Sequence, residues 1–166
     1  PVTAQTKWLG GEGRNALARL SGRVWGCWHG APGIGLRSDT ALLFTCWPDD
    51  AASGAAMELL RNAPPVRGLE GTPLHATVRP TQSTPVDGKG IWVFREFEID
   101  RANTDRFVEL SANAWETFEA RFDVHIDGLF RAPDPEEDLA SLLLVTRYAD
   151  LATWESSRSA ESDPES

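Results

Sequence analysis

Residues Gly90–Ile99 read GIWVFREFEI, a run of aromatic and β-branched side chains that is typical of a β-strand. Asp100 and Asn103 follow, and both side chains are suited to capping a helix. Apolar residues then recur at helical spacing, at Phe107, Leu110, Ala114, Trp115, Phe118 and Phe122. This stretch predicts a strand that leads directly into an amphipathic helix.

The residues beyond this helix predict a hairpin and a second helix. Val124–Ala132 and Leu139–Tyr148 have the composition of strands, and Pro133–Asp138 between them is an acidic turn. Asp150 is placed to cap a helix that carries Leu151, Trp154 and Arg158. The second half of the chain is therefore expected to run strand, helix, strand, strand, helix.

Part of this text occurs twice in the chain. Gly26–Pro32 resembles Gly128–Pro133 at an offset of 102 residues, and Leu42–Asp49 resembles Leu143–Asp150 at an offset of 101. One small deletion in the intervening turn reconciles the two offsets. An internal repeat is the simplest explanation.

The first half is expected to contain the same kinds of element. We predict strands at Val2–Leu9, Val24–His29, Ala41–Trp47 and Leu74–Val78, the last closing the first sheet, and helices at Arg14–Leu20 and Asp49–Asn62. The predicted organisation is a first repeat at 1–80, a connector rich in Pro, Ser and Thr at 81–89, a second repeat at 90–158 and an acidic disordered tail at 159–166.

The composition excludes several functional classes. The chain has 166 residues and a formal net charge of −9, and Lys occurs only at Lys7 and Lys89. Because the cations do not cluster, we expect no nucleic-acid partner. No apolar run approaches the ~18 residues of a membrane helix and no signal peptide is visible, so we expect no membrane association and a cytoplasmic location.

Three segments of the second half support a resemblance to a known family. Gly128–Arg131 (GLFR), an apolar strand that ends in Thr146–Ala149 (TRYA), and Trp154–Arg158 (WESSR) together resemble the NIPSNAP and EthD-like branch of the dimeric α+β barrel proteins. The match covers residues 90–158 well and 24–80 weakly. It implies an α+β fold of two tandem ferredoxin-like repeats, whose antiparallel sheets pack as a pseudo-dimeric α+β barrel within one chain.

Alternation along the predicted strands selects candidate site residues, because every second side chain of a strand lies on the same face. A hairpin centred near Asp138 would place Arg147 opposite Leu129 and diagonal to Asp127. The more polar set in the second half is His125, Asp127, Leu129 and Arg131, and the equivalent set in the first half is Trp25, Cys27, His29 and Cys46.

From these sets we predict a cavity that holds a flat, partly polar organic ligand. The predicted catalytic residues are His29, His125, Asp127 and Arg131, and the predicted ligand-binding residues are Trp25, Trp47, Trp92, Arg147 and Tyr148. The structural alternatives are a strand-end His29, an exposed His125 and an ordinary cross-strand ion network. Cys27 and Cys46 are either core thiols or a cross-strand redox pair.

The family resemblance implies cofactor-free monooxygenases, cyclases, degradation accessories or haem enzymes. We therefore expect an uncharacterised small-molecule-binding protein, in one reading a cofactor-independent monooxygenase, cyclase or isomerase acting on a small aromatic or polyketide-like compound. The alternatives are a non-catalytic metabolite-binding or structural accessory protein and a haem protein with His29 or His125 as axial ligand. The preferred prediction has no cofactor and no metal, a small organic ligand as partner, and a monomer or homodimer as the assembly.

Overall fold

A computed structural model describes residues 2–30, 36–37, 39–134 and 136–160. Residues 161–166 of the predicted tail lie outside the described residues. The chain is a mixed α+β protein with antiparallel sheets, and its contacts divide it into two compact units. Unit 1 contains residues 1–71 and 83–86, and unit 2 contains 72–82 and 87–166. The chain therefore passes from one unit to the other at residues 71–72, 82–83 and 86–87.

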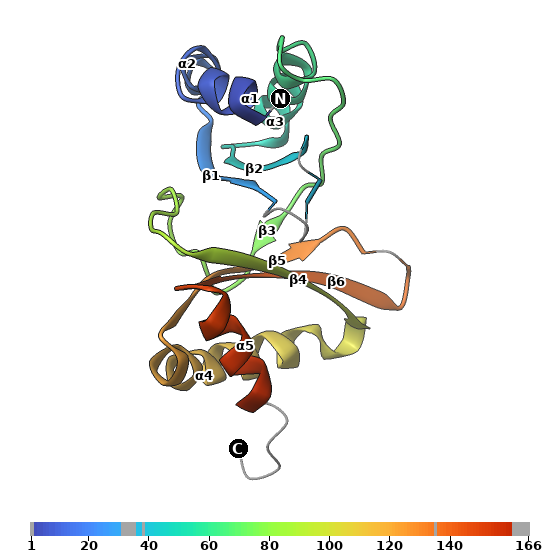
Figure 1. The fold of residues 1–166 in the computed structure, drawn as a ribbon. Helices are drawn as coiled ribbons and strands as arrows, with labels where there is room; N and C mark the ends of the chain where they lie inside the picture. The colour runs from blue at the N-terminus through green and yellow to red at the C-terminus, as the bar shows by residue number, and fades with distance from the viewer. Residues whose placement is uncertain (1, 31–35, 38, 135, 161–166) are drawn as a thin grey trace. The chain divides into compact units, whose positions relative to one another are not determined.

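Unit 1 packs helices against one side of a two-stranded antiparallel sheet (Figure 1). Its core is formed by Leu17, Ala56 and Leu60, with Val24 and Leu43 of the sheet packed against them. The elements in chain order are α1 (Val2–Leu9), α2 (Glu12–Arg19), β1 (Arg23–His29), β2 (Ala41–Cys46) and α3 (Asp50–Arg61).

The prediction of a strand at Val2–Leu9 is wrong, because this segment is helix α1. Trp8 and Leu9 are adjacent in sequence, yet both pack against the Leu17 cluster. Neighbouring side chains of a strand point to opposite faces, whereas a helix can direct both toward one core. The remaining elements predicted between residues 14 and 62 are confirmed within a few residues at their ends.

Unit 2 is built on a four-stranded sheet in the order β3-β5-β6-β4, with α4 and α5 on one side of it (Figure 1). Trp115 of α4 packs against Ile126, Leu129 and Leu142 of the sheet to form the core. The elements are β3 (His75–Ala76), β4 (Ile91–Asp100), the short 3₁₀ helix η1 (Arg101–Asn103), α4 (Thr104–Phe122), β5 (Val124–Ala132), β6 (Leu139–Tyr148) and α5 (Leu151–Ala160). The element order predicted for the second half is confirmed.

The predicted closing strand of the first sheet belongs to the other sheet. Strand β3 pairs with β5, with His75 opposite Arg131 and Ala76 opposite Phe130. Beyond β3, the N–H of Leu129 donates to the carbonyl of Arg79 at 3.1 Å. Without this pairing, the outer backbone groups of β5 would lack a partner, which is costly for a buried strand.

The internal repeat extends to the backbone geometry of the strands. Strand β1 has one extra residue, Trp25, relative to β2, and β5 has one extra residue, Asp127, relative to β6. The two bulges lie 102 residues apart, the offset found between the repeated sequence blocks. In each strand a glycine follows the bulge, Gly26 in the first and Gly128 in the second.

The turns that flank each hairpin repeat as well. Ser21 and Asp123, also 102 residues apart, are the two non-glycine residues of the described chain with positive φ, at 61° and 50°. Asp49 and Asp150 each accept a backbone N–H at 2.8 Å at the start of the helix after the hairpin. A helix, a left-handed turn, a bulged hairpin and a capped helix thus form the repeated unit.

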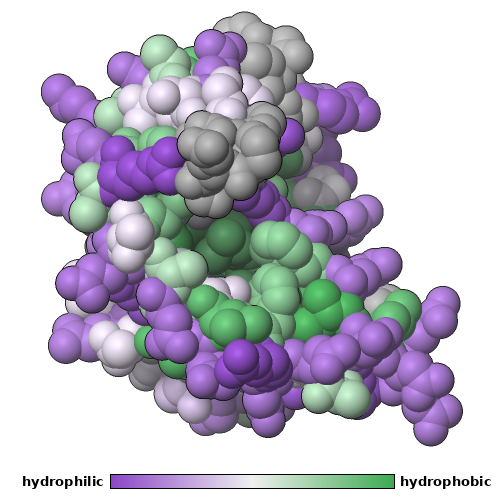
Figure 2. All heavy atoms as spheres, turned by 90° about the horizontal axis from the view of Figure 1, so that it is seen from below, coloured by the Kyte–Doolittle hydropathy of each residue, from purple (hydrophilic) through white to green (hydrophobic). Residues whose placement is uncertain are grey.

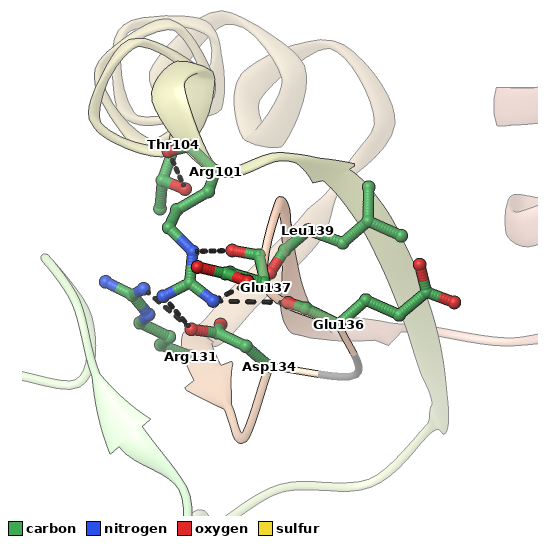
Figure 3. A network of polar contacts seen from close by, with 7 residues as sticks. All are labelled: Arg101, Thr104, Arg131, Asp134, Glu136, Glu137 and Leu139. Carbon is green, nitrogen blue, oxygen red and sulfur yellow. Dashed lines mark hydrogen bonds and ion pairs between the residues drawn. The ribbon is translucent and has the colours of Figure 1, made fainter.

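An arginine network holds the turn between β5 and β6 (Figure 3). The Arg101 backbone N–H donates to the Asp138 carbonyl at 2.8 Å, and its guanidinium donates to the carbonyl of Glu137 at 2.6 Å. The same guanidinium forms an ion pair with Asp134 at 2.6 Å. Arg131 also contacts Asp134, at 3.2 Å, so that two cations share one carboxylate at this end of the hairpin.

We predict that the glycines beside the bulges are required by packing. A Cβ at residue 128 would lie 2.6 Å from the Phe130 ring, and one at residue 26 would lie 2.0 Å from the Trp28 ring. Gly128→Ala and Gly26→Ala should each lower the free energy of unfolding by about 1–3 kcal/mol, measured by urea denaturation.

Gly54→Ala is the matched control, because Gly54 lies within α3 and a Cβ there would meet nothing within 4 Å. This substitution should raise stability by up to about 1 kcal/mol through helix propensity. Equal effects of the three substitutions would show that the aromatic contacts do not constrain residues 26 and 128.

Candidate functional site

The bulge at Asp127 decides which side chains of β5 share a face. Ile126 pairs with Thr146 and Leu129 pairs with Leu144, so both lie on the face packed against α4. His125 pairs with Arg147, on the face opposite α4. The predicted alternation through His125, Asp127, Leu129 and Arg131 is therefore wrong, because the extra residue reverses the alternation between its second and third members.

Three predicted residues form one row across the sheet, on the face opposite α4. Arg147 of β6 pairs with Trp92 of β4 on one side and with His125 of β5 on the other. The Trp92 indole Nε1 donates a 2.7 Å hydrogen bond to Oδ2 of Asp127. The indole thus spans the central strand, and the structure brings together Trp92, His125, Asp127 and Arg147.

His125 lies between two carboxylates. Its Nδ1 is 3.3 Å from Oε1 of Glu119, and its Nε2 is 3.6 Å from Oδ1 of Asp127. The His125 side chain is 52% exposed, whereas that of Asp127 is only 8% exposed. The imidazole therefore connects a buried carboxylate with solvent.

Glu119 of α4 joins this site to the outer edge of β5. Its Oε1 accepts the backbone N–H of Ile126 at 2.7 Å and pairs with the Arg79 guanidinium at 2.7 Å. Arg79 also donates to the Ile126 carbonyl at 3.2 Å and lies over the Trp115 ring. Burial alone would raise the pKa of Glu119, but the hydrogen bonds from Arg79 and Ile126 outweigh it and lower that pKa.

Asp127 has the opposite electrostatic balance. Burial raises the pKa of its carboxyl group above the ordinary value, and the negative charge of Glu119 adds to this effect. The hydrogen bond from Trp92 and the charges of His125 and Arg147 oppose the shift without cancelling it. A carboxylate that is costly to ionise and lies beside an imidazole is a stronger base than a solvated aspartate.

Four other predicted site residues lie on helix-facing sides of their sheets. Arg131 pairs with Leu142 of the α4 core, and its guanidinium reaches Asp134. Tyr148 has 0% exposure, and Trp47 packs on the Leu17 cluster of unit 1. His29 accepts or donates a 3.0 Å hydrogen bond at Thr6 of α1. None of the four joins the row formed by Trp92, Arg147 and His125.

The bulge at Trp25 separates the predicted residues of unit 1 in the same way. Trp25 is buried and stacks on Phe44 at 5.7 Å between ring centroids. Cys27 pairs with Leu43 on the face of the Leu17 cluster, whereas Cys46 pairs with Arg23. Because residues 43 and 46 of one regular strand point to opposite faces, the proposed cross-strand redox pair is wrong. Burial raises the pKa of both thiols, which makes them less reactive.

Neither imidazole considered for haem has the surroundings of an axial ligand. Nε2 of His29 is engaged by Thr6, and His125 lies between two carboxylates rather than facing an apolar slot. In the described part of the chain, no group of three or more His, Cys, Asp or Glu side chains is arranged to hold a metal ion.

An open depression of about 500 Å³ lies at the far end of β4 from Trp92. Phe107 and Leu110 of α4 line it together with Ile99, and Leu110 is 50% exposed although its helical spacing had suggested a core residue. Figure 2 shows that apolar residues gather in the middle of the face seen from below, with polar residues around them. None of the row residues lines this depression.

Within the described residues, no helix combines the length and the apolar character needed to cross a membrane.

No protein-family model, curated protein or solved structure matches this chain. The resemblance to the NIPSNAP and EthD-like proteins therefore stays a prediction.

Sequence reasoning did not find Glu119 or Arg79. Glu119 lies on an amphipathic helix among several acidic residues, and its sequence neighbours give no sign that it turns back to the edge of β5. Arg79 lies between the predicted strand Leu74–Val78 and the predicted connector at 81–89, in a stretch to which no function was assigned. Both side chains bond the backbone of Ile126, which lies 7 residues after Glu119 and 47 residues after Arg79.

We predict that Glu119→Gln lowers the free energy of unfolding by about 1–2 kcal/mol at pH 7, because it weakens a charge-assisted bond to Arg79. The lowered pKa of Glu119 means that its stabilisation is present above the unfolded-state pKa of about 4.3 and is lost as the pH falls through the folded-state value. The difference from wild type should therefore shrink in acid, as measured by urea denaturation at pH 7 and pH 3.

Glu116→Gln is the control for this measurement, because Glu116 is an exposed carboxylate on the same helix. If Glu116→Gln lowers the free energy of unfolding as much as Glu119→Gln, the contacts of Glu119 with Arg79 and Ile126 contribute no specific stability.

We predict the opposite pH dependence for Asp127→Asn. Because burial raises the pKa of Asp127, its contribution to stability is complete below the unfolded-state pKa of about 3.9 and is lost as the pH rises through the folded-state value. Asparagine resembles the protonated carboxyl group and keeps an acceptor for Trp92. The variant should melt at a higher temperature than wild type at pH 7 and at a similar temperature at pH 3.

Glu98→Gln, which alters an exposed carboxylate of β4, should show no such dependence. A melting difference for Asp127→Asn that is the same at both pH values would contradict an ionised, buried Asp127.

Proposed function

We propose that this chain binds a small organic compound on the face of the unit 2 sheet opposite α4 and catalyses cofactor-independent proton transfer there. The observation that carries the proposal is the Asp127 carboxylate, which is 8% exposed, is held by the Trp92 N–H and has a raised pKa caused by burial. Titratable groups with pKa values shifted by burial and by specific partners concentrate at functional sites.

In the proposed reaction, Asp127 removes a proton from a carbon next to a carbonyl group. The electron pair of the broken C–H bond moves into the carbonyl to form an enolate, and the proton rests on the Asp127 carboxyl group. Returning that proton to a different atom completes an isomerisation, and attack of the enolate on a second carbonyl of the same molecule begins a cyclisation. Neither outcome requires an external oxidant or reductant.

The neighbouring residues have distinct roles in this proposal. Trp92 holds Oδ2 of Asp127, so Oδ1, which lies 3.6 Å from Nε2 of His125, is the oxygen that receives the substrate proton. Once Asp127 has taken the substrate proton, Glu119 is the remaining ionised acceptor at the ring and favours the His125 tautomer that carries its proton on Nδ1. Nε2 of His125 then faces Asp127 as an acceptor and can pass the proton on toward solvent.

The strand order also supports a finer structural proposal. In unit 2, the order β5-β6-β4 with α4 and α5 on one side matches the first three strands of a ferredoxin-like unit, and β3 is added beside β5. We propose that the second repeat is a ferredoxin-like unit of the NIPSNAP and EthD-like kind. A tandem of two such repeats packed as an α+β barrel is a prediction of the resemblance alone.

The test is proton exchange in D₂O, followed by ¹H NMR on a panel of small aromatic ketones and keto acids. Wild type should accelerate the loss of the signals from protons next to the carbonyl, and Asp127→Asn should reduce that acceleration about 100-fold or more. Trp92→Phe, which removes the hydrogen bond and keeps a ring, should cause a smaller loss.

Glu116→Gln should catalyse the proton exchange at the wild-type rate. Exchange that survives Asp127→Asn would contradict the proposal, and a ligand retained in native mass spectrometry without any exchange would favour the non-catalytic binding protein.

A further inference from the structure

The Arg147 guanidinium has no partner of opposite charge in the described part of the chain. Its Nε is fully buried and makes no hydrogen bond, and no ion pair joins it to a carboxylate within 4.0 Å. Asp127 is close enough for the charge of Arg147 to act on its ionisation, yet the two side chains do not form a salt bridge. A guanidinium offers five N–H donors, and a buried donor without an acceptor destabilises the folded state.

A glycine-rich segment brings the backbone directly against this guanidinium. Gly88 and Gly90 have φ values of 138° and 139°, which L side chains rarely adopt. A Cβ at residue 88 would lie 1.8 Å from Nη1 of Arg147, and one at residue 90 would lie 2.2 Å from the Tyr148 carbonyl oxygen. The backbone of this segment therefore lies against the Arg147 side chain.

The surroundings of Arg147 indicate which chemistry would satisfy it. A planar guanidinium matches a carboxylate through two parallel N–H···O bonds, which a point charge such as lysine does not provide. Trp92, the cross-strand neighbour of Arg147, places an aromatic ring in the same row. Asp127 lies at the bulge of β5, which is the strand on the other side of Arg147 from Trp92.

We propose that Arg147 binds the carboxylate of a small aromatic acid whose ring lies against Trp92 and whose reactive carbon faces Asp127. This inference rests on the proposed function, since it names the substrate class of the same site. The Arg147 guanidinium binds the anionic end of the substrate. It contributes equally to binding of the substrate and of the transition state, whereas Asp127 carries out the proton transfer.

Benzoate is the probe, and benzamide is its neutral analogue of nearly the same shape. In calorimetric titrations, wild type should bind benzoate with a dissociation constant of about 1 mM or lower and should bind benzamide at least about tenfold more weakly. Arg147→Met should weaken benzoate binding about tenfold or more, and Arg147→Lys should lose less because it keeps the charge.

Two further variants isolate the role of Arg147. Arg106→Met removes an exposed arginine of α4 that pairs with Glu109, and it should leave benzoate binding unchanged. Asp127→Asn should keep or strengthen benzoate binding, because it removes a negative charge near the anion. Thermal melts of each variant establish that it is folded before titration.

The proposal is overturned if Arg147→Met binds benzoate as tightly as wild type, if benzamide binds as tightly as benzoate, or if wild type does not bind benzoate. These outcomes are independent of the exchange experiment. If benzoate binding depends on Arg147 but proton exchange does not depend on Asp127, the carboxylate site is supported and the proposed reaction is contradicted. If proton exchange depends on Asp127 but benzoate binding does not depend on Arg147, the reaction is supported and the carboxylate site is contradicted.

Discussion

A single extra residue in β5 determines which side chains of this strand enter the core and which lie at the candidate site. Without the bulge at Asp127, residues 125, 127, 129 and 131 would share one face, and the α4 core would lose Leu129. With the bulge, Leu129 enters the core while His125 and Asp127 stay on the opposite face. Gly128 permits this geometry because the Phe130 ring lies against its α-carbon. The core and the candidate site therefore depend on the same local backbone distortion.

The two repeats share one backbone geometry but have different side chains at the bulge. Trp25 occupies the bulge of β1 and stacks on Phe44, whereas Asp127 occupies the bulge of β5 and accepts a hydrogen bond from Trp92. The helix caps, left-handed turns and glycine contacts recur, so the constraint on the backbone is common to both halves. What differs is the side chain at the bulge, and only the second half places an ionisable group there.

Two carboxylates within reach of one imidazole have opposite electrostatic environments. Hydrogen bonds from Arg79 and Ile126 stabilise the ionised form of Glu119, while burial destabilises the ionised form of Asp127. Such a division of pKa values is what acid–base chemistry requires, because one group remains a fixed anion while the other exchanges a proton. Arg147 adds a cation that neither carboxylate neutralises through a salt bridge. In the proposed reaction, Asp127 acts as the base, His125 carries the proton toward solvent and Arg147 binds the anionic end of the substrate.

The sequence by itself determined the α+β class, the element order of the second half and the internal repeat, because hydrophobic periodicity and capping residues are local signals. It also selected Trp92, His125, Asp127 and Arg147. It failed at α1, where periodicity over eight residues did not separate a strand from a helix, and at β3, whose partner strand lies more than fifty residues away. Only the tertiary structure decided the faces of β5, since a bulge reverses alternation without leaving a mark in the hydrophobic pattern. It alone also brought Glu119 and Arg79 to the edge of β5 and left Arg147 beside Gly88 without an acceptor, because these contacts join residues that are distant in sequence.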